Sequence, residues 1–461
     1  MSPGASSSSR ASMPPGSVVH PSKIPRGLGQ AFRFGLAGVA STGLILLFWL
    51  RVGIYHHCVS FPREAAAWQA IRAQRQPVFI SGPWTEYRGI LHSHSKLSHD
   101  CEVPFEEILS VLKRTGLDFI CLSDHPIAGR ADFDLQWRGL HQGKLFIPGF
   151  EMKEGMMPFG VNSGIVLSNQ TPAPVLAGEV ARNGGLLFYA HPEETRAWDE
   201  PNLVGMEIYN LHSDLKRQKD GLRGMLPDLI LNRDRYPEQL LHRLFVRPTE
   251  FLRRWDDLNR TRHLTGIAGN DCHQNTGFRA FCTESNTLRI EDTSPRTLRE
   301  IHLNWFTRLL ARLLFGPLTP GRKLFHVELD PYDRSARYVN THVLAQELSE
   351  PALLHALQAG RVFIGFDLIA DSSGFRWMAH GSGALTVMGE SVPYAGGLVL
   401  RASSPLPCRF TIVKDGMRVY QALGRNLEWS PPGSGKYRVE AELKILNQWV
   451  PWVYANPIEL L

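Results

Sequence analysis

The chain has 461 residues, of which 43% are hydrophobic and 10% aromatic, and its formal net charge is +6. This length exceeds what one hydrophobic core usually holds, so we expect two domains or one large domain with additions, and the composition excludes a wholly disordered chain. The positive charge is concentrated in residues 1–57, which contain five basic residues and no acid. The remaining residues are nearly neutral, which argues against nucleic-acid binding, and the sequence identifies no protein partner.

The cysteines of the chain are sparse, and none of the six belongs to a CxxC pair. This spacing argues against a disulfide scaffold and against a zinc ribbon. We expect free, buried thiols.

The N-terminal residues predict a disordered basic arm followed by a membrane anchor. Residues 1–30 are rich in Ser, Pro and Gly, and residues 31–55 contain the uncharged run Phe34–Leu50 between two arginines. As a helix this run spans about 25 Å, just short of a hydrocarbon core of about 30 Å. A secretory signal or a buried helix is the alternative reading. Because basic residues are more numerous before the run, we expect a single-pass membrane protein with a cytoplasmic N-terminus and its body on the extracytoplasmic (periplasmic) side.

Six short apolar segments between residues 87 and 273 each run into side chains that bind metals. Tyr87–Leu91 precedes His92 and His94, Leu117–Leu122 precedes Asp124 and His125, Leu145–Phe150 precedes Glu151, Leu186–Ala190 precedes His191, Leu203–Met206 precedes Glu207, and Leu264–Gly269 precedes Asp271 and His273. Helix-like stretches lie between them, most clearly Pro104–Leu112, which ends shortly before Gly116. Strands alternating with helices, with polar groups at the strand ends, are typical of a parallel barrel whose active site lies at that rim.

Taken singly, each of these histidines is more often a hydrogen-bonded core or surface residue than a metal ligand. The joint pattern is harder to explain in that way, because a spacing of two in extended chain directs both side chains of a pair to one side. Imidazoles and carboxylates without a thiolate suit zinc, manganese or iron, and more than four ligands imply more than one ion.

Five motifs in a fixed order connect the chain to a known superfamily. They are HxH (His92, His94), SDH (Ser123–His125), GxE (Gly149–Glu151), AHP (Ala190–Pro192) and GNDxH (Gly269–His273). With these motifs the chain resembles the polymerase and histidinol phosphatase (PHP) superfamily over roughly residues 87–290. The resemblance implies a distorted (β/α)7 barrel that holds two or three divalent ions.

The resemblance also implies which residues bind the ions. His92, His94, Glu151 and Asp271 would bind the first ion, Glu151 would bridge to a second ion held also by His191, and His125 and His273 would hold a third. The family often has an acidic ligand where this sequence has His99, so we favour the next residue, Asp100, and keep His99 as its substitute. Glu207 and Asn210 match an acidic GxExxN segment of the family, and whether Glu207 touches metal stays open.

The expected chemistry follows from the ions. Water between two divalent ions is acidified toward neutrality, while the same ions neutralise charge on a phosphoryl or acyl oxygen. We therefore predict a membrane-anchored multi-metal hydrolase that uses a metal-activated hydroxide to cleave a phosphoester in a small-molecule or lipid-proximal substrate. Asp124 is expected to orient a ligand and to carry a proton, because the consecutive residues Ser123–His125 cannot form a serine triad. His212 is a candidate acid for the leaving group.

Residues 295–325 form a basic insertion that does not fit a barrel. The segment WFTRLLARLLF predicts a helix that places Arg308 and Arg312 together. This helix either packs on the body with a basic outer stripe or lies on the bilayer that holds the anchor. Glu350–Phe366 predicts a helix and a strand that resemble the closing unit of the PHP branch that includes carbamate-ester hydrolases.

Residues 383–461 predict an antiparallel β-sandwich, because short alternating strands flank a turn at Asp415-Gly416. The expected organisation is thus an arm (1–30), an anchor (31–55), a barrel (80–370) and a sandwich (383–461). Two alternatives to a phosphoesterase stay open: a carboxyl- or carbamate-ester hydrolase with the same metal site, and a non-catalytic, metal-stabilised binding module at the membrane. An amidohydrolase is disfavoured because the bridging lysine of that class has no candidate at Glu151.

Overall fold

The computed structural model describes residues 41–461 except 42, 46, 79–81, 218, 276, 284–285, 292–296, 329 and 382–383. The predicted arm and most of the uncharged run therefore lie outside the described residues. Within them, Gly43–Arg72 is one helix that is long and apolar enough to cross a membrane, and an 18-residue stretch of it has a mean hydropathy of 1.5. It includes a π-helical turn at His56–Ser60 and continues as α2 (Phe61–Arg72). The six cysteines are free, and all except Cys58 are buried.

Six parallel strands form the centre of the body. They are β1 (Thr85–Ser93), β2 (Phe119–Cys121), β5 (Lys144–Ile147), β8 (Leu186–Tyr189), β9 (Leu203–Asn210) and β10 (Thr265–Cys272), paired in the order β5-β2-β1-β10-β9-β8. Each of the six apolar segments that were expected to be strands contains one of these strands. The strand β6 (Met156–Phe159) is antiparallel to β8, and an isolated bridge joins its Phe159 to Gly149, just after β5.

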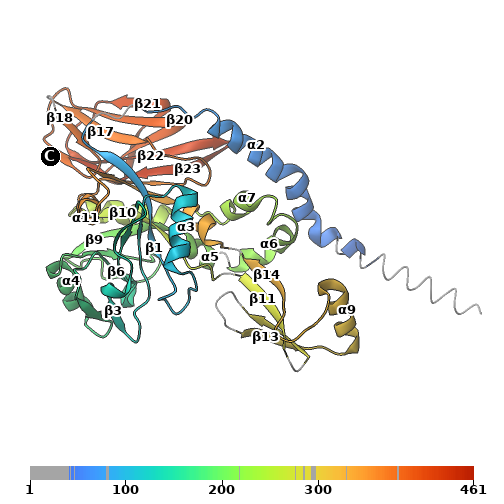
Figure 1. The fold of residues 1–461 in the computed structure, drawn as a ribbon. Helices are drawn as coiled ribbons and strands as arrows, with labels where there is room; N and C mark the ends of the chain where they lie inside the picture. The colour runs from blue at the N-terminus through green and yellow to red at the C-terminus, as the bar shows by residue number, and fades with distance from the viewer. Residues whose placement is uncertain are drawn as a thin grey trace, which may run out of the picture.

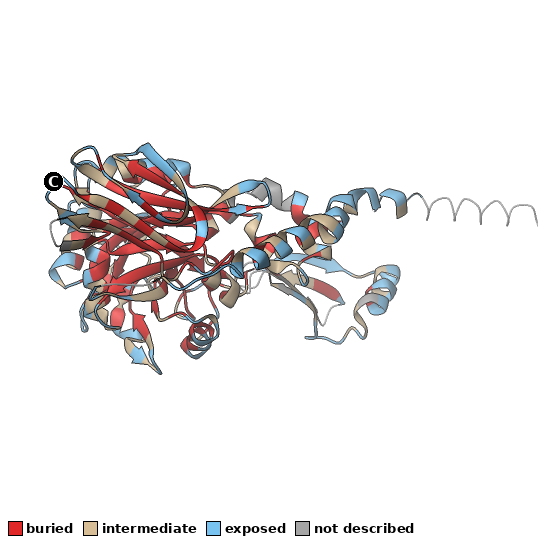
Figure 2. Ribbon diagram, turned by 90° about the horizontal axis from the view of Figure 1, so that it is seen from above, coloured by how far each residue is buried: buried red, intermediate tan, exposed pale blue. Residues whose placement is uncertain are grey.

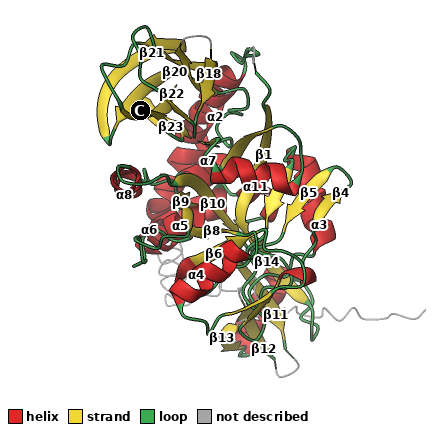
Figure 3. Cartoon of the chain, turned by 90° about the vertical axis from the view of Figure 1, so that its left-hand side faces the viewer, coloured by secondary structure: helices red, strands yellow, loops and turns green. Residues whose placement is uncertain are grey.

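Helices and short strands fill the connections between these strands (Figures 1 and 3). They are α3 (Phe105–Thr115), β3 (Arg130–Asp132), β4 (Gly139–His141), β7 (Val166–Ser168), α4 (Ala173–Arg182), α5 (Leu211–Arg217), α6 (Lys219–Leu231), α7 (Pro237–His242), α8 (Thr249–Asn259), α10 (Tyr332–Tyr338) and α11 (Glu350–Gln358). The helix predicted after Pro104 is confirmed as α3. It buries Ile108 and Leu112 and ends at Gly116, whose φ of 71° a residue with a side chain rarely adopts.

The basic insertion is part of a larger unit that the sequence did not predict. A separate antiparallel sheet consists of β11 (Gly277–Cys282), β12 (Thr287–Glu291), β13 (Thr297–His302) and β14 (Lys323–Glu328). The predicted helix is confirmed as α9 (Trp305–Phe315), between β13 and β14. The insertion thus begins near residue 277, directly after the expected ligand His273.

The C-terminal strands continue the large sheet. They are β15 (Asn340–Ala345), β16 (Val362–Gly365), β17 (Arg376–Gly381), β18 (Ala384–Val387), β19 (Ser391–Val392), β20 (Val399–Lys414), β21 (Met417–Trp429), β22 (Gly435–Ile445), β23 (Gln448–Ala455) and β24 (Ile458–Leu460). β15 pairs antiparallel with β1, β15 with β16, and β16 with β23. The turn predicted at Asp415-Gly416 joins β20 to β21.

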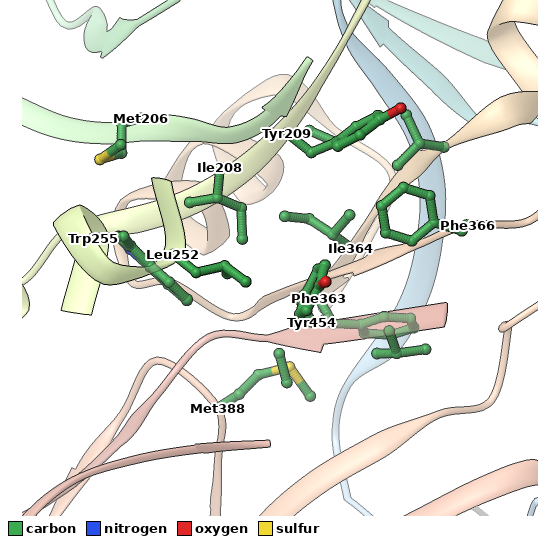
Figure 4. Packing of buried hydrophobic residues seen from close by; sticks show 14 of the residues in the cluster. Met206, Ile208, Tyr209, Leu252, Trp255, Phe363, Ile364, Phe366, Met388 and Tyr454 are labelled. Carbon is green, nitrogen blue, oxygen red and sulfur yellow. The ribbon is translucent and has the colours of Figure 1, made fainter. Parts of the chain in front are cut away.

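One hydrophobic core joins the parallel strands to the C-terminal strands. Trp255 of α8 and Met206 of β9 belong to the same buried cluster as Phe363 of β16 and Tyr454 of β23 (Figure 4). The fold is therefore mixed α/β, built around a large sheet and a shared core. This continuity positions the ends of the parallel strands rigidly.

Candidate metal centre

The expected ligands converge at the carboxyl ends of the parallel strands. Nine side chains form four overlapping groups whose ligand atoms lie within 4.8 Å of one another: His94, Asp100, His125 and His273; His92, His191 and Asp271; His92, His94 and Glu151; and His212, Asp271 and His273. Parallel strands present their carboxyl ends at one edge, which explains why residues up to 180 positions apart meet there.

Glu151 and Asp271 lie at the middle of this centre. Glu151 Oε2 is 3.3 Å from His92 Nε2, and Glu151 Oε1 is 3.1 Å from His191 Nε2. Asp271 Oδ1 is 3.2 Å from His92 Nε2 and 3.3 Å from His94 Nε2. The two carboxylates thus face the imidazoles of two neighbouring ligand groups.

Asp100, rather than His99, lies in the centre. Asp100 Oδ2 is 3.2 Å from His273 Nε2 and 3.4 Å from His125 Nε2. His99 is exposed, and its ring centroid is 5.0 Å from that of His125. Asp100 therefore belongs to one of the ligand groups, and His99 belongs to none of those found among the described residues.

Three residues of the centre have left-handed backbone conformations. The φ angles are 63° at His92, 50° at His191 and 51° at Asp271. Such a conformation costs a residue with a side chain about 1–3 kcal/mol, and it persists where the surrounding structure imposes it, most often at functional sites. This signal is independent of any family resemblance.

Glu207 lies behind the ligands instead of among them. Its Oε1 accepts a hydrogen bond from His92 Nδ1 at 2.6 Å, and its Oε2 accepts from the His191 backbone N–H and from Asn210 Nδ2, both at 2.9 Å. A Cβ at Gly269 would lie 2.0 Å from Glu207 Oε1, so only glycine leaves room for the carboxylate. Glu207 therefore orients His92 and leaves Nε2 directed at the centre.

Asp124 lies outside the ligand groups found among the described residues. It is fully buried, and its oxygens accept hydrogen bonds from the Ser95 backbone N–H at 2.6 Å, Ser95 Oγ at 2.9 Å and Gln136 Nε2 at 2.7 Å. These contacts engage both oxygens, so Asp124 braces the loop after β1, next to His94, and its expected part in proton transfer stays a prediction. His212 does reach the centre, with its ring centroid 5.9 Å from that of His273.

Several residues of the site were not predicted from the sequence. Ser98 Oγ lies 3.1 Å from His94 Nδ1 and accepts from the His125 backbone N–H at 3.0 Å, so one hydroxyl positions two ligands. Glu193 Oε1 lies 3.5 Å from His191 Nδ1, which fixes the orientation of that ring. Glu193 follows the AHP motif by one residue, and this adjacency was the available signal.

An open cavity of about 220 Å³ lies over the centre. It is lined by Asp100, His125, Glu151, Gly155, His191, Glu194, Arg196, His212, Asp271, His273 and Asn275. Arg196 is the arginine of this lining. Its guanidinium donates to the Ala190 carbonyl oxygen from Nε and to Glu194 Oε2 from Nη2, both at 3.0 Å. A Cβ at Gly155 would lie only 2.3 Å from this guanidinium, so glycine at this position leaves room for the Arg196 side chain.

The carboxyls of the centre are held in their ionised form. Burial raises the pKa of Glu151 and Asp271, but the neighbouring imidazoles outweigh this and hold both values well below the ordinary range. Burial likewise opposes charge on the imidazoles, yet the carboxylates raise the pKa of His191 to about 10 and that of His273 to about 9. His94 differs, because burial and the nearby His273 lower its pKa to about 3.

The donor set fits divalent cations. His94 Nε2 and Asp271 Oδ1 are buried 3.3 Å apart, yet neither makes a hydrogen bond of good geometry with the described residues. Buried polar atoms are rarely left in this state, and a cation between them would satisfy both. Imidazoles and carboxylates without a thiolate are the ligands of zinc, manganese and iron.

Comparison with known proteins adds a remote likeness. No family model and no curated protein matches the chain. Among solved structures it is similar to a two-domain protein from Bacteroides vulgatus ATCC 8482 containing a predicted PHP-like metal-dependent phosphoesterase. The identity is 14%, the match covers 84% of this chain and 99% of the other, and the TM-score is 0.36. A likeness this loose carries no weight for activity, which has to be argued from the centre itself.

Proposed function

We propose that the protein is a metal-dependent hydrolase of phosphoesters. The observation that carries this proposal is the convergence of nine imidazole and carboxylate side chains, seven of which line an open cavity. A structural metal site is closed by its protein ligands, whereas a catalytic site leaves room for water and substrate. When bound, two or three divalent ions would activate water as the nucleophile and offset negative charge that develops on the ester.

Side chains of the chain would bind and orient the ions and supply a proton to the leaving group. Glu151 and Asp271 face more than one imidazole group and are suited to bridge ions, while Glu207 and Ser98 hold the imidazoles in orientation. Hydrolysis joins the oxygen of water to phosphorus and breaks the bond to the leaving oxygen, which needs a proton. His212 lines the cavity beside His273 and is our candidate donor of that proton.

Arg196 favours a phosphoester over a carboxyl or carbamate ester. A phosphoryl group carries negative charge on its non-bridging oxygens, and a guanidinium binds such oxygens through paired N–H groups. An uncharged acyl ester offers this cation no comparable partner. The Arg196 guanidinium, held on the cavity wall by Ala190 and Glu194, therefore supports a phosphoester over the acyl-ester alternative.

The test is hydrolysis of nitrophenyl monophosphate, a phosphodiester and a carboxylic ester by the full chain, with and without a chelator. We expect metal-dependent phosphoester hydrolysis that is abolished in His92→Ala and kept in the control His326→Ala, whose side chain is exposed on β14. Arg196→Met should raise KM for the phosphoester. Carboxylic ester hydrolysis alone would favour the acyl-ester alternative, and bound metal without turnover on any ester would favour the binding module.

We further propose that the strands form a distorted barrel of PHP type with a C-terminal sandwich. The parallel order β5-β2-β1-β10-β9-β8 and the bridge between Gly149 and Phe159 support closure. The long antiparallel strands β20, β21 and β22 support the sandwich.

We also propose that the helix Gly43–Arg72 anchors the protein in a membrane. Between Leu44 and Tyr55 it exposes eight large apolar side chains and the charged Arg51, where soluble proteins expose few such apolar groups. The basic arm before the helix favours a cytoplasmic N-terminus and an extracytoplasmic, periplasmic body. Cys58 is the exposed cysteine of the described chain, so a membrane-impermeant maleimide should label it from the periplasm of intact cells. Labelling that requires the inner membrane to be opened would reverse the orientation.

A further inference from the structure

The outer face of α9 is apolar, which is the reverse of an ordinary surface helix. Five large apolar side chains are exposed on it: Trp305, Phe306, Leu309, Leu310 and Leu313, with exposed fractions from 46% to 80%. Its inner face is fixed to the insertion, because Ala311 is buried and the Phe315 ring lies 5.7 Å from that of Phe325 on β14. An exposed apolar face of this size marks a surface that something else covers.

The helix itself has a defined beginning and end. The side chain of Asn304 accepts a hydrogen bond from the Thr307 backbone N–H at 2.9 Å and caps the N-terminus. Gly316, with a φ of 77°, ends the helix. Apolar residues at positions 305, 309 and 313 recur every four residues and therefore stay on one side along its whole length.

The position of α9 indicates what covers it. Figure 1 shows α9 at the same end of the molecule from which the N-terminal helix projects, and the view from above in Figure 2 agrees. That helix exposes Leu44, Leu47 and Phe48 at this end. Two apolar surfaces from distant parts of the chain thus face the same side of the protein.

The charges around α9 select a lipid surface over a second copy of the chain. Arg299, Arg312, Arg322 and Lys323 are exposed near the helix, so two such faces would bring like charges together. Anionic lipid headgroups complement the same charges, and an exposed Trp is typical of the boundary between headgroups and acyl chains.

We propose that α9 is a second membrane contact, lying in the headgroup boundary with Trp305, Leu309 and Leu313 among the acyl chains. This inference rests on the membrane anchor proposed above. Together, the two contacts hold the insertion against the bilayer. The insertion leaves the body directly after Asn275, a residue of the cavity lining, so the bilayer fixes the element that continues from the metal centre.

The test is fluorescence quenching by brominated acyl chains on the full chain in lipid nanodiscs that contain anionic lipid. Single cysteines are introduced at Leu309 or Leu313 of α9, at Phe48 of the anchor and at Leu423 of β21, each in a Cys58→Ser background, and labelled with bimane. Leu423 is the matched control, because its exposed fraction of 69% is close to the 75% of Leu313 and it lies on the C-terminal sheet.

We expect the labels at Leu309, Leu313 and Phe48 to be quenched at least twofold, and the label at Leu423 to be unaffected. Quenching at Phe48 without quenching at α9 would overturn the second contact and leave the anchor intact. Absence of quenching at Phe48 would instead refute the anchor. Excimer formation between pyrene labels at Leu313, without lipid quenching, would show that a second copy covers the helix and would also overturn the proposal.

Discussion

The Glu207→Gln substitution should weaken metal binding without unfolding the protein. Glu207 is fully buried, and its carboxylate accepts three hydrogen bonds, from His92 Nδ1, the His191 backbone N–H and Asn210 Nδ2. Glutamine has nearly the same shape, but one of its two terminal atoms is an NH2 group. That group would face one of these donors, so at least one bond is lost and His92 is no longer held in a single orientation.

The size of the effect follows from two independent considerations. A hydrogen bond to a charged group contributes about 1.5–3 kcal/mol. Loss of a partner that orients a metal-bound histidine typically reduces metal affinity by about 10–100-fold, which corresponds to about 1.4–2.7 kcal/mol. The two ranges agree, and we expect a reduction in affinity within them.

Isothermal titration of metal-stripped full chain with zinc or manganese measures this affinity. Glu200→Gln is the matched control, because Glu200 is also buried and accepts hydrogen bonds from the Asn202 backbone N–H at 3.0 Å and from Asn202 Nδ2 at 3.1 Å. Circular dichroism in the presence of a chelator reports whether each variant is folded. An unchanged affinity in folded Glu207→Gln would refute the orienting role of Glu207.

Three further predictions test other parts of the structure. Asp100→Ala should lower the number of metal ions per chain in elemental analysis and His99→Ala should not; the reverse result would make His99 the ligand. Buried His342 has its pKa raised from the ordinary 6.5 to about 9, because Asp367 and Glu86 outweigh burial. Its contribution to stability, on the order of 3 kcal/mol, is therefore fully present below pH 6.5 and is lost as the pH rises through 9. His342→Gln should remove this loss from denaturant titrations between pH 6 and 9.5, and equal pH dependence in both proteins would contradict it. Buried Arg438 is bonded to both Asp256 oxygens, at 2.6 and 2.7 Å. Asp256→Asn should therefore destabilise the fold by about 3 kcal/mol, because Arg438 loses its main partner, and the double variant Asp256→Leu/Arg438→Leu should regain stability. A stable single variant would contradict the reasoning.

The sequence identified the elements of the body because their signals are local. An apolar run that ends in a polar residue predicts a strand end wherever it occurs, and Pro104 with Gly116 marks both ends of α3. Most of the candidate ligands were found for the same reason, since they lie at or just after the end of one of these strands. What could not be predicted depends on contacts between distant segments. The carboxylate of Glu207 reaches His92 only because β9 lies next to β10, which in turn pairs with β1.

In the insertion, too, local elements could be predicted from the sequence but contacts between distant segments could not. Its helix has a strong local signal in WFTRLLARLLF, and the structure places α9 at those residues. The strands β11 and β14 are far apart in sequence, and their pairing is visible only in the fold. Asp124 was expected to orient a ligand and carry a proton, and the direction of its side chain is set by Ser95 and Gln136, which lie 29 and 12 residues away in the sequence. Sequence adjacency does not determine that direction.

The backbone of the centre gives a physical reason to connect metal binding with the stability of the fold. Left-handed conformations at His92, His191 and Asp271 together cost several kcal/mol, at about 1–3 kcal/mol each. This cost falls on the folded state, and a cation that binds only this state offsets it through its binding free energy. The surrounding hydrophobic core, which is continuous with the C-terminal strands, has to impose these conformations before any ion binds. The strain is thus localised where the side chains of the centre point inward. It occurs at three residues on three different strand ends, as expected for a preorganised cation site and not for a chance cluster of histidines.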